Sequence, residues 1–321
     1  MTRIKSEQSK NNKFQFQYLE VENYACKHND INSNNIISRL RSHTDVIFTL
    51  ILLPNGDLAS GSNDETIIIW DSDNFKIKYN LKAHLDGIRA LITNKNGDLV
   101  SGSLDDTIIV WDAMNNYKIK HHLKGHSNAV RSLALLDNND LVSGSYDKTI
   151  IIWDVEKETI KHRMYGHTNM ILTLLLLPNN VLASGSSDMT IILWETTSAK
   201  EKAKLTGHNS YVTSLVLLKN GDLASGSEDF SIIIWDLVKL TIKNRLIGHT
   251  NYVSALALVS NGDLISGSQD QTIIVWDTNK MEKKYELKGH EENVTSLAVM
   301  SNGYLASGSH DKTIIIWKLH N

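Results

Sequence analysis

Serine, histidine and aspartate recur along this chain at spacings that could support nucleophilic catalysis. One histidine opens each of seven copies: His43, His84, His126, His167, His208, His249 and His290. An aspartate follows each histidine after 21 residues: Asp64, Asp105, Asp147, Asp188, Asp229, Asp270 and Asp311. A Ser-Gly-Ser tripeptide, such as Ser143 to Ser145, lies between the two. A serine activated by a histidine that an aspartate orients would form the catalytic triad of a serine hydrolase.

A tryptophan in the same register favours a structural use of these groups. It lies six residues after each aspartate, at Trp70, Trp111, Trp153, Trp194, Trp235, Trp276 and Trp317. Aspartate in a tight turn can accept from histidine, histidine can bond to serine, and serine can accept from the indole N–H. Buried polar groups that satisfy one another fix a unique packing. Two expected structural sets are His126, Asp147 and Trp153, and His208, Asp229 and Trp235.

The local context of these residues argues against catalysis and against a cofactor. Both serines of a tripeptide lie on the same strand face, so the sequence leaves open whether Ser143 or Ser145 joins the hydrogen-bond chain. Seven identical active sites in one chain would be unusual, and no repeat has a Gly-x-Ser-x-Gly context. Gly61 and its equivalents lie in expected strands rather than in a phosphate loop. Cys26 is the only cysteine and no paired-histidine spacing recurs, so we expect neither a metal nor a cofactor.

The elements that position these groups repeat with the tryptophans, which lie 41 or 42 residues apart. A period near forty residues is the mark of a repeat architecture. In the third copy four strands are predicted, at residues 130–136, 141–145, 149–153 and 160–164. The third strand is apolar at consecutive positions, as in a strand covered on both faces. The fourth is more polar, as at an edge that faces water. Each copy therefore predicts a four-stranded antiparallel sheet that buries its faces against its neighbours.

The connections between the first two strands carry a turn signal. Asn-Gly occurs there in five copies, for example at Asn55-Gly56. This pair tolerates positive φ at both central positions, so it predicts a two-residue hairpin turn. Asn139 and Asn180 replace the glycine in two copies, and asparagine is the next most tolerant residue there.

Composition limits the classes of function. The net charge of −3 over 321 residues gives no overall attraction to nucleic acid or to anionic membranes. No run of eighteen apolar residues could cross a bilayer, and the first residues lack the apolar core of a secretory signal. A single cysteine fits a reducing compartment. We therefore expect a cytoplasmic protein that binds neither membrane nor nucleic acid.

These recurring motifs resemble the WD-repeat (WD40) β-propeller family. Its marks are Gly125-His126, Ser143-Gly144-Ser145, Asp147 and Trp153-Asp154. Departures are few: Ser42 and Ala83 replace the glycine before histidine, and Glu195 and Lys318 replace the aspartate after tryptophan. The resemblance implies an all-β fold, a seven-bladed propeller of four-stranded antiparallel blades. It covers residues 36–321 and leaves residues 1–35 as a polar, loosely ordered segment. In this family the Asp–His–Ser–Trp chain is a known internal brace.

The last blade lacks a fourth strand of its own. Only four residues follow Trp317, whereas a fourth-strand pattern precedes the first histidine. In five other copies that strand carries leucine three residues before histidine, and several carry isoleucine seven before it; here these positions are Leu40 and Ile36. We infer that residues 36–41 complete the last blade and close the ring, which removes an exposed edge.

Positions that differ between copies are the candidates for function. Three such positions lie three and five residues after histidine and just before the turn aspartate. In WD-repeat propellers these loops share the top face beside the channel, so the resemblance implies a ring of variable residues there. The predicted protein-binding residues are Phe48, Arg89, Arg131, Tyr146, Met170, Leu172, Tyr211 and Tyr252. Tyrosine and arginine are frequent anchors of interfaces, although part of this set could simply fill the channel.

The leading hypothesis is a non-enzymatic scaffold that binds proteins or peptides on its top face. Arg89 and Arg131 could hold a carboxylate or a phosphate, or could simply be solvated. Partners are therefore expected to be proteins or peptides with acidic or phosphorylated residues, bound by a monomer within a larger assembly. One alternative is a substrate- or regulator-binding subunit of a complex of ubiquitin-ligase or G-protein β-like type. The other is a serine hydrolase.

Overall fold

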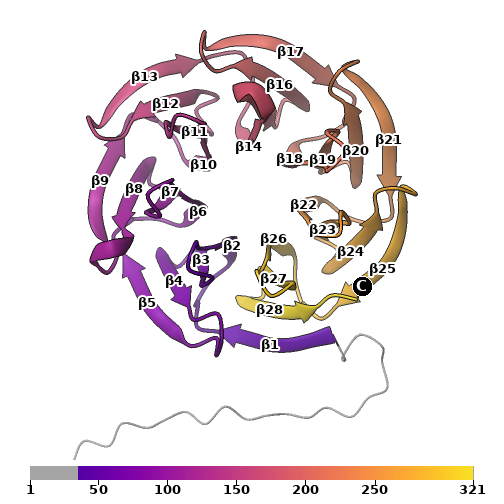
Figure 1. The fold of residues 1–321 in the computed structure, drawn as a ribbon, viewed down its shortest axis with the longest axis horizontal. Helices are drawn as coiled ribbons and strands as arrows, with labels where there is room; N and C mark the ends of the chain where they lie inside the picture. Colours follow the sequence, from indigo (N-terminus) through magenta and orange to yellow (C-terminus); the bar gives the residue numbers. More distant parts are fainter. Residues whose placement is uncertain (1–34, 321) are drawn as a thin grey trace, which may run out of the picture.

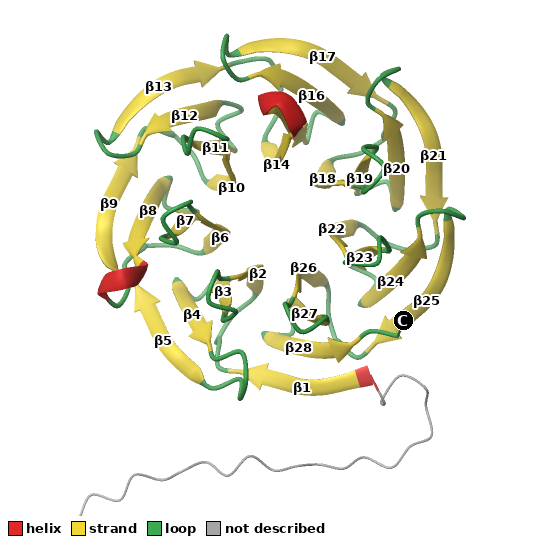
Figure 2. Ribbon diagram, viewed as in Figure 1, coloured by secondary structure: helices red, strands yellow, loops and turns green. Residues whose placement is uncertain are grey.

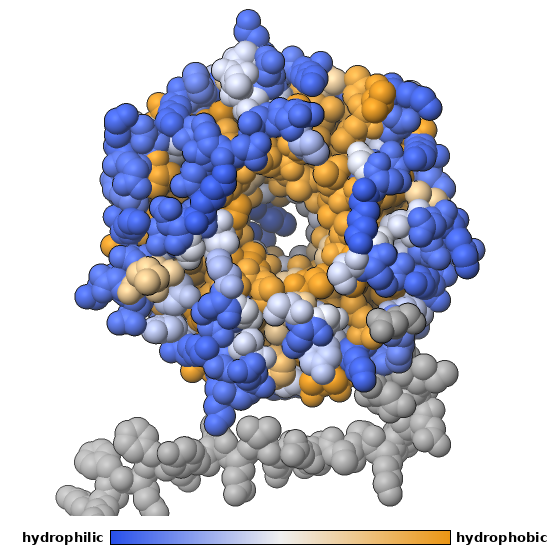
Figure 3. Space-filling view, viewed as in Figure 1, coloured by the Kyte–Doolittle hydropathy of each residue, from blue (hydrophilic) through white to orange (hydrophobic). Residues whose placement is uncertain are grey.

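The computed structural model describes residues 35–320, which form seven radial blades around a central channel (Figures 1 and 2). Each blade is a four-stranded antiparallel sheet. This confirms the predicted all-β, seven-bladed propeller. In the space-filling view the ring is open at its centre, and hydrophobic residues surround the opening (Figure 3). The expected boundary of the N-terminal segment at residue 35 concerns residues that lie almost wholly outside the described range. No helix in residues 35–320 is long and apolar enough to cross a membrane.

The strands follow one another from the channel to the rim in each blade. Blade 1 contains β2 (Ile47–Leu52), β3 (Leu58–Ser62), β4 (Thr66–Trp70) and β5 (Ile77–Lys82). Blade 2 contains β6 (Ile88–Thr93), β7 (Leu99–Ser103), β8 (Thr107–Asp112) and β9 (Lys118–Lys124). Blade 3 contains β10 (Val130–Leu135), β11 (Leu141–Ser145), β12 (Ile150–Asp154) and β13 (Thr159–Met164). Blade 4 contains β14 (Ile171–Leu177), β15 (Val181–Ser186), β16 (Thr190–Glu195) and β17 (Lys200–Thr206).

The remaining blades repeat this order. Blade 5 contains β18 (Val212–Leu217), β19 (Leu223–Ser227), β20 (Ser231–Asp236) and β21 (Thr241–Ile247). Blade 6 contains β22 (Val253–Leu258), β23 (Leu264–Ser268), β24 (Thr272–Asp277) and β25 (Glu282–Lys288). Blade 7 contains β26 (Val294–Val299), β27 (Tyr304–Ser309), β28 (Thr313–Lys318) and the N-terminal β1 (Ile36–Arg41). Two short 3-10 helices, η2 (Ala113–Asn115) and η3 (Pro178–Asn180), lie in loops.

Strand β1 closes the ring as predicted. It pairs antiparallel with β28, with Ile36 opposite Trp317 and Leu40 opposite Ile314. Figure 1 shows β1 outside β28, at the rim of the blade that also holds the last strands of the chain. The rim position of the last blade is thus filled from the other end of the chain, and the edge of β28 is covered.

The core lies between neighbouring blades rather than within any one blade. One apolar cluster combines Ile68 and Trp70 of blade 1 with Ala306 and Ile316 of blade 7. The second strands are buried along their length, apart from the first residue of β15 and of β27, because the inner strand of the next blade packs against them. At Gly144 an added Cβ would lie 2.7 Å from Cγ2 of Ile171 in blade 4. This close approach explains why glycine separates the two serines.

The loops between the first and second strands correct the predicted turn. Gly56 N donates to Leu53 O at 2.9 Å, and Leu53 N donates to Asp57 O at 2.8 Å. The loop therefore spans three residues, and Gly56 alone in it has positive φ, at 89°. In the five Asn-Gly copies the expected two-residue turn with two positive φ angles is wrong, because a type I turn followed by one left-handed residue joins the strands. Asn139 takes the glycine's place at φ 70°.

Candidate functional site

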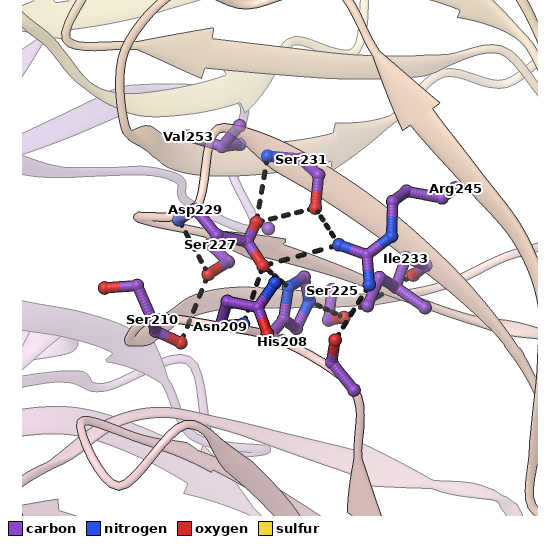
Figure 4. Close-up of polar contacts among 12 residues, drawn as sticks. His208, Asn209, Ser210, Ser225, Ser227, Asp229, Ser231, Ile233, Arg245 and Val253 are labelled. Atoms are coloured by element: carbon purple, nitrogen blue, oxygen red, sulfur yellow. Dashed lines mark hydrogen bonds and ion pairs between the residues drawn. The ribbon is translucent and has the colours of Figure 1, made fainter.

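The repeated polar residues form one buried hydrogen-bond chain in every blade. In blade 3, His126 Nδ1 lies 2.8 Å from Asp147 Oδ2, and His126 Nε2 lies 2.7 Å from Ser143 Oγ. Trp153 Nε1 donates to the same serine oxygen at 2.8 Å. The blade 5 network consists of His208, Asp229, Ser225 and Trp235, and its polar contacts around His208 are drawn in Figure 4. These contacts hold the histidine loop, the aspartate turn and the third strand together.

The two serines of each tripeptide have different roles. The first, Ser143, joins the chain to histidine and tryptophan. The second, Ser145, accepts from Asp147 N at 3.0 Å and donates to Asn128 O at 2.8 Å. The first serine therefore links loop to core, and the second closes the turn that holds the aspartate.

The Ser–His–Asp geometry resembles a catalytic triad but is closed to substrate. The first serine of each tripeptide is 0% exposed in all seven blades. When His126 donates from Nδ1 to Asp147, its Nε2 accepts from the hydroxyl of Ser143, which is also the acceptor for Trp153. A carbonyl carbon cannot reach an oxygen enclosed in this way. The geometry stabilises the blade and leaves no room for nucleophilic attack.

The turn aspartates are stabilised in their charged form. Burial by itself would raise the pKa of Asp147, but hydrogen bonds from His126, Thr149 and the backbone of Ser127 outweigh it. The net shift is downward, and the same direction holds at the other six turns. A carboxylate with several donors remains ionised well below neutral pH.

A different set of residues lines a cavity of about 240 Å³ at the mouth of the channel. The face that carries the histidine loops and aspartate turns is called the top face below. All eight residues predicted for protein binding line this cavity: Phe48, Arg89, Arg131, Tyr146, Met170, Leu172, Tyr211 and Tyr252. Leu172 is 9% exposed and belongs to the wall, whereas the other seven are partly exposed. Residues from six blades, far apart in sequence, thus meet around one opening.

The two arginines lie close together at this mouth and lack ion-pair partners within the described range. The guanidinium of Arg89 stacks on Phe48, with Cζ 3.5 Å from the ring centroid, a cation–π contact. The buried Nε of Arg89 has no hydrogen-bond partner among the described residues. Burial first and the charge of Arg131 second lower the pKa of Arg89 to about 10, so it stays charged at neutral pH. Arg89 is therefore not simply solvated, because it is partly buried and stacks on Phe48.

Sequence reasoning missed several residues that belong to the cavity or its edge. Ser187, Glu228 and His310 line it, and each precedes a turn aspartate in one of the variable columns, but residue type alone did not single them out. His310 lies edge-on to Phe48 at 6.3 Å between ring centroids. Phe230, just after a turn aspartate, contacts Tyr252 at 5.7 Å and is 42% exposed. Its position in the turn gave no signal of that contact.

Comparison with known families agrees with this architecture. The family model described as WD domain, G-beta repeat, matches residues 34–71, 75–112, 117–154, 158–195, 199–236, 240–277 and 281–318. The chain belongs to the WD40 repeat family. Propellers of this family generally act as non-enzymatic scaffolds that bind proteins or peptides. No curated protein matches this chain. No group of three or more histidine, cysteine, aspartate or glutamate residues within residues 35–320 is arranged to hold a metal ion.

Proposed function

We propose that this protein is a non-enzymatic scaffold that binds a partner protein or peptide at the mouth of the channel on its top face. One observation carries the proposal. Eight residues from variable positions line a single cavity, and two of them are arginines that form no ion pair within residues 35–320. The partner segment is one that carries an apolar or aromatic residue near an acidic or phosphorylated residue.

The two kinds of contact supply affinity and selectivity in different ways. Met170, Tyr211 and Tyr252 offer partly exposed apolar surface at the mouth, which a partner side chain would cover. Buried aromatic contacts at the centre of an interface provide much of its binding free energy. Arg89 and Arg131 favour a carboxylate or phosphate, because charge-assisted hydrogen bonds to guanidinium are strong and directional.

Two other roles fit these observations less fully. A substrate- or regulator-binding subunit of a larger complex, of ubiquitin-ligase or G-protein β-like type, would use the same cavity and differ only in its companions. A serine hydrolase would need an accessible nucleophile, and the buried first serines argue against it. Labelling with a serine-reactive fluorophosphonate would support the hydrolase only if a serine in the intact folded chain reacts.

The test combines affinity capture with binding isotherms. A partner captured from cell extract on the intact chain is purified and titrated against Tyr211→Ala with Tyr252→Ala, for which we expect a loss of about 2 kcal/mol or more. Arg89→Glu with Arg131→Glu should weaken binding further and flatten its dependence on salt. Neither double variant should change the melting temperature by much, since neither belongs to the buried network.

The matched control lies on loops that follow the tryptophans. Met114 and Val238 are 91% and 94% exposed there, outside the cavity. Met114→Ala with Val238→Ala removes a similar apolar surface and should leave affinity unchanged. If both cavity variants kept full affinity for the partner and the control variant lost affinity, the binding site would not lie on the top face.

A further inference from the structure

Positive and negative side chains lie on different sides of the channel mouth. Arg89 and Arg131 stand on blades 2 and 3, and Glu228 stands on blade 5, yet all three line the same cavity. The innermost strands of blades 2 to 5, which are β6, β10, β14 and β18, follow one another around the channel (Figure 1). Blade 4 therefore separates the positive side of the mouth from the negative side.

Glu228 has no counter-ion within residues 35–320. Its side chain is partly buried and forms neither a hydrogen bond nor an ion pair with any described residue. Burial alone raises its pKa, and neither arginine contributes to that shift. Neither Arg89 nor Arg131 forms an ion pair with Glu228, so the two charges are not joined across the mouth.

Elsewhere the chain does pair its shielded carboxylates. Five aspartates after the first hairpin loops each bind a lysine of the outer strand: Asp57 with Lys78, Asp98 with Lys120, Asp140 with Lys161, Asp222 with Lys243, and Asp263 with Lys284. At the position equivalent to Glu228 in blade 1, Asn63 donates to Asp45 at 2.8 Å. Glu228 is thus an exception in a chain that pairs its other shielded carboxylates in the same way from blade to blade.

Residues of blade 4 line the cavity between the two arginines and Glu228. Met170 and Leu172 supply apolar wall, and Ser187 lies between the blades that carry the charges. Ser187 is 2% exposed, and its Oγ has no hydrogen-bond partner in the described part of the chain. A buried hydroxyl without a partner is costly unless a bound molecule satisfies it. This side of the mouth therefore offers apolar contact and contains one buried hydroxyl without a partner among the described residues.

We infer that the partner is a dipolar segment that crosses the mouth in one orientation, with an acidic side chain at Arg89 and Arg131, an apolar side chain at blade 4, and a basic side chain at Glu228. This rests on the proposed function and deepens it, because it names the charge order of the partner. Complementary charges select one orientation, since the reversed segment brings like charges together in a partly desolvated site.

The experiment selects ligands from random sequences, so it does not require the partner to be identified first. Phage-displayed random peptides of about twelve residues, roughly 40 Å when extended, are selected on the immobilised intact chain and on its Glu228→Gln variant. We expect the unchanged chain to select an acidic and a basic residue on opposite sides of an apolar one, always in the same order. Glu228→Gln should keep the acidic and apolar positions and lose the basic one. Glu65→Gln changes a top-face glutamate outside the cavity and should change nothing.

Binding isotherms then test the contact between Glu228 and the basic residue of a selected peptide. Replacing the basic residue of a selected peptide by glutamine should weaken binding to the unchanged chain about tenfold, and should have little effect on Glu228→Gln. Peptides that contain only acidic and apolar residues, with selection unaltered by Glu228→Gln, would overturn this inference and leave the proposed function standing. Peptides that bind equally well after Tyr211 and Tyr252 and both arginines are replaced would overturn both. Failure to select any peptide also counts against both.

Discussion

Two buried serines show how differently this protein treats its repeated network and its channel mouth. Ser143 and Ser187 are 0% and 2% exposed. Ser143 bonds to both His126 and Trp153, whereas the Oγ of Ser187 has no partner in the described residues. The first occurs at the same place in seven blades, and the second belongs to a column in which no two blades agree. Complete satisfaction of polar groups marks the stabilising region, and incomplete satisfaction marks the region that we propose to bind a partner.

The electrostatics of the two regions differ in the same way. In the network, each turn aspartate is surrounded by donors that favour its charge. At the mouth, Arg89 and Glu228 are partly buried and form no ion pair with a described residue, and burial shifts each pKa toward the neutral form. An ion pair within the protein would stabilise the folded state more than these unpaired, partly buried charges do. Leaving them unpaired costs stability, which a bound partner could restore.

Removal of the closing strand should have the largest effect on the scaffold. Deleting residues 1–41 removes β1 and uncovers the edge of β28, so we expect aggregation or loss of cooperative unfolding. Deleting residues 1–30 leaves β1 intact and should be nearly harmless. Chemical denaturation and light scattering of the two truncations measure this. Equal behaviour would show that the ring does not depend on β1.

Trp153→Ala should come next in size. It removes a side chain that is 1% exposed and deprives Ser143 of the indole donor. Large-to-small changes of this kind cost about 3–5 kcal/mol. Urea denaturation gives the change in the free energy of unfolding. A midpoint that barely moves would mean that the repeated tryptophan contributes little to packing.

The two serines themselves provide the sharpest test of the comparison. Ser143→Ala should cost about 1–3 kcal/mol, because it leaves a buried imidazole nitrogen and a buried indole N–H without partners. Ser187→Ala removes a hydroxyl that is already unpaired, so stability should change by less than about 0.5 kcal/mol or rise slightly. Thermal and urea melts of both variants decide the matter. Equal losses would contradict the distinction between the two regions.

The pH dependence of stability tests whether the turn aspartates are held in their charged form. The folded pKa of Asp147 lies below its unfolded value of about 3.9, so its contribution is fully present above that pH and is lost as pH falls further. Asp147→Asn should cost about 1–3 kcal/mol near neutral pH. The gap to the unchanged chain should shrink below about pH 4.

The control for this titration is an exposed aspartate in a loop. Asp137→Asn replaces a carboxylate that takes part in no side-chain hydrogen bond among the described residues, and it should leave the pH profile unchanged. Urea denaturation across the acid range compares the two variants. A gap for Asp147→Asn that stays constant down to low pH would show that the carboxylate is not held in its charged form.

Much of the fold follows from local pattern and period. The 41-residue register of histidine, aspartate and tryptophan predicts the blades, and Leu40 with Ile36 predicts the closing strand, because each strand must repeat the contacts of its equivalents. The turn was predicted less well. Asn55-Gly56 fits both two- and three-residue hairpins, and only the backbone bonds at Leu53 distinguish them.

The sequence by itself determined the number of blades, the closure of the ring and the histidine, aspartate and tryptophan of the buried network, since these depend on residue types at fixed spacings. The tertiary structure decided which serine joins the network, because both lie on one strand face and only the distance to Trp153 separates them. It also decided that Arg89 stacks on Phe48 and that Glu228 has no compensating charge among the described residues. Burial and counter-ions at the mouth depend on distances between blades, and no repeat carries that information within its own forty residues.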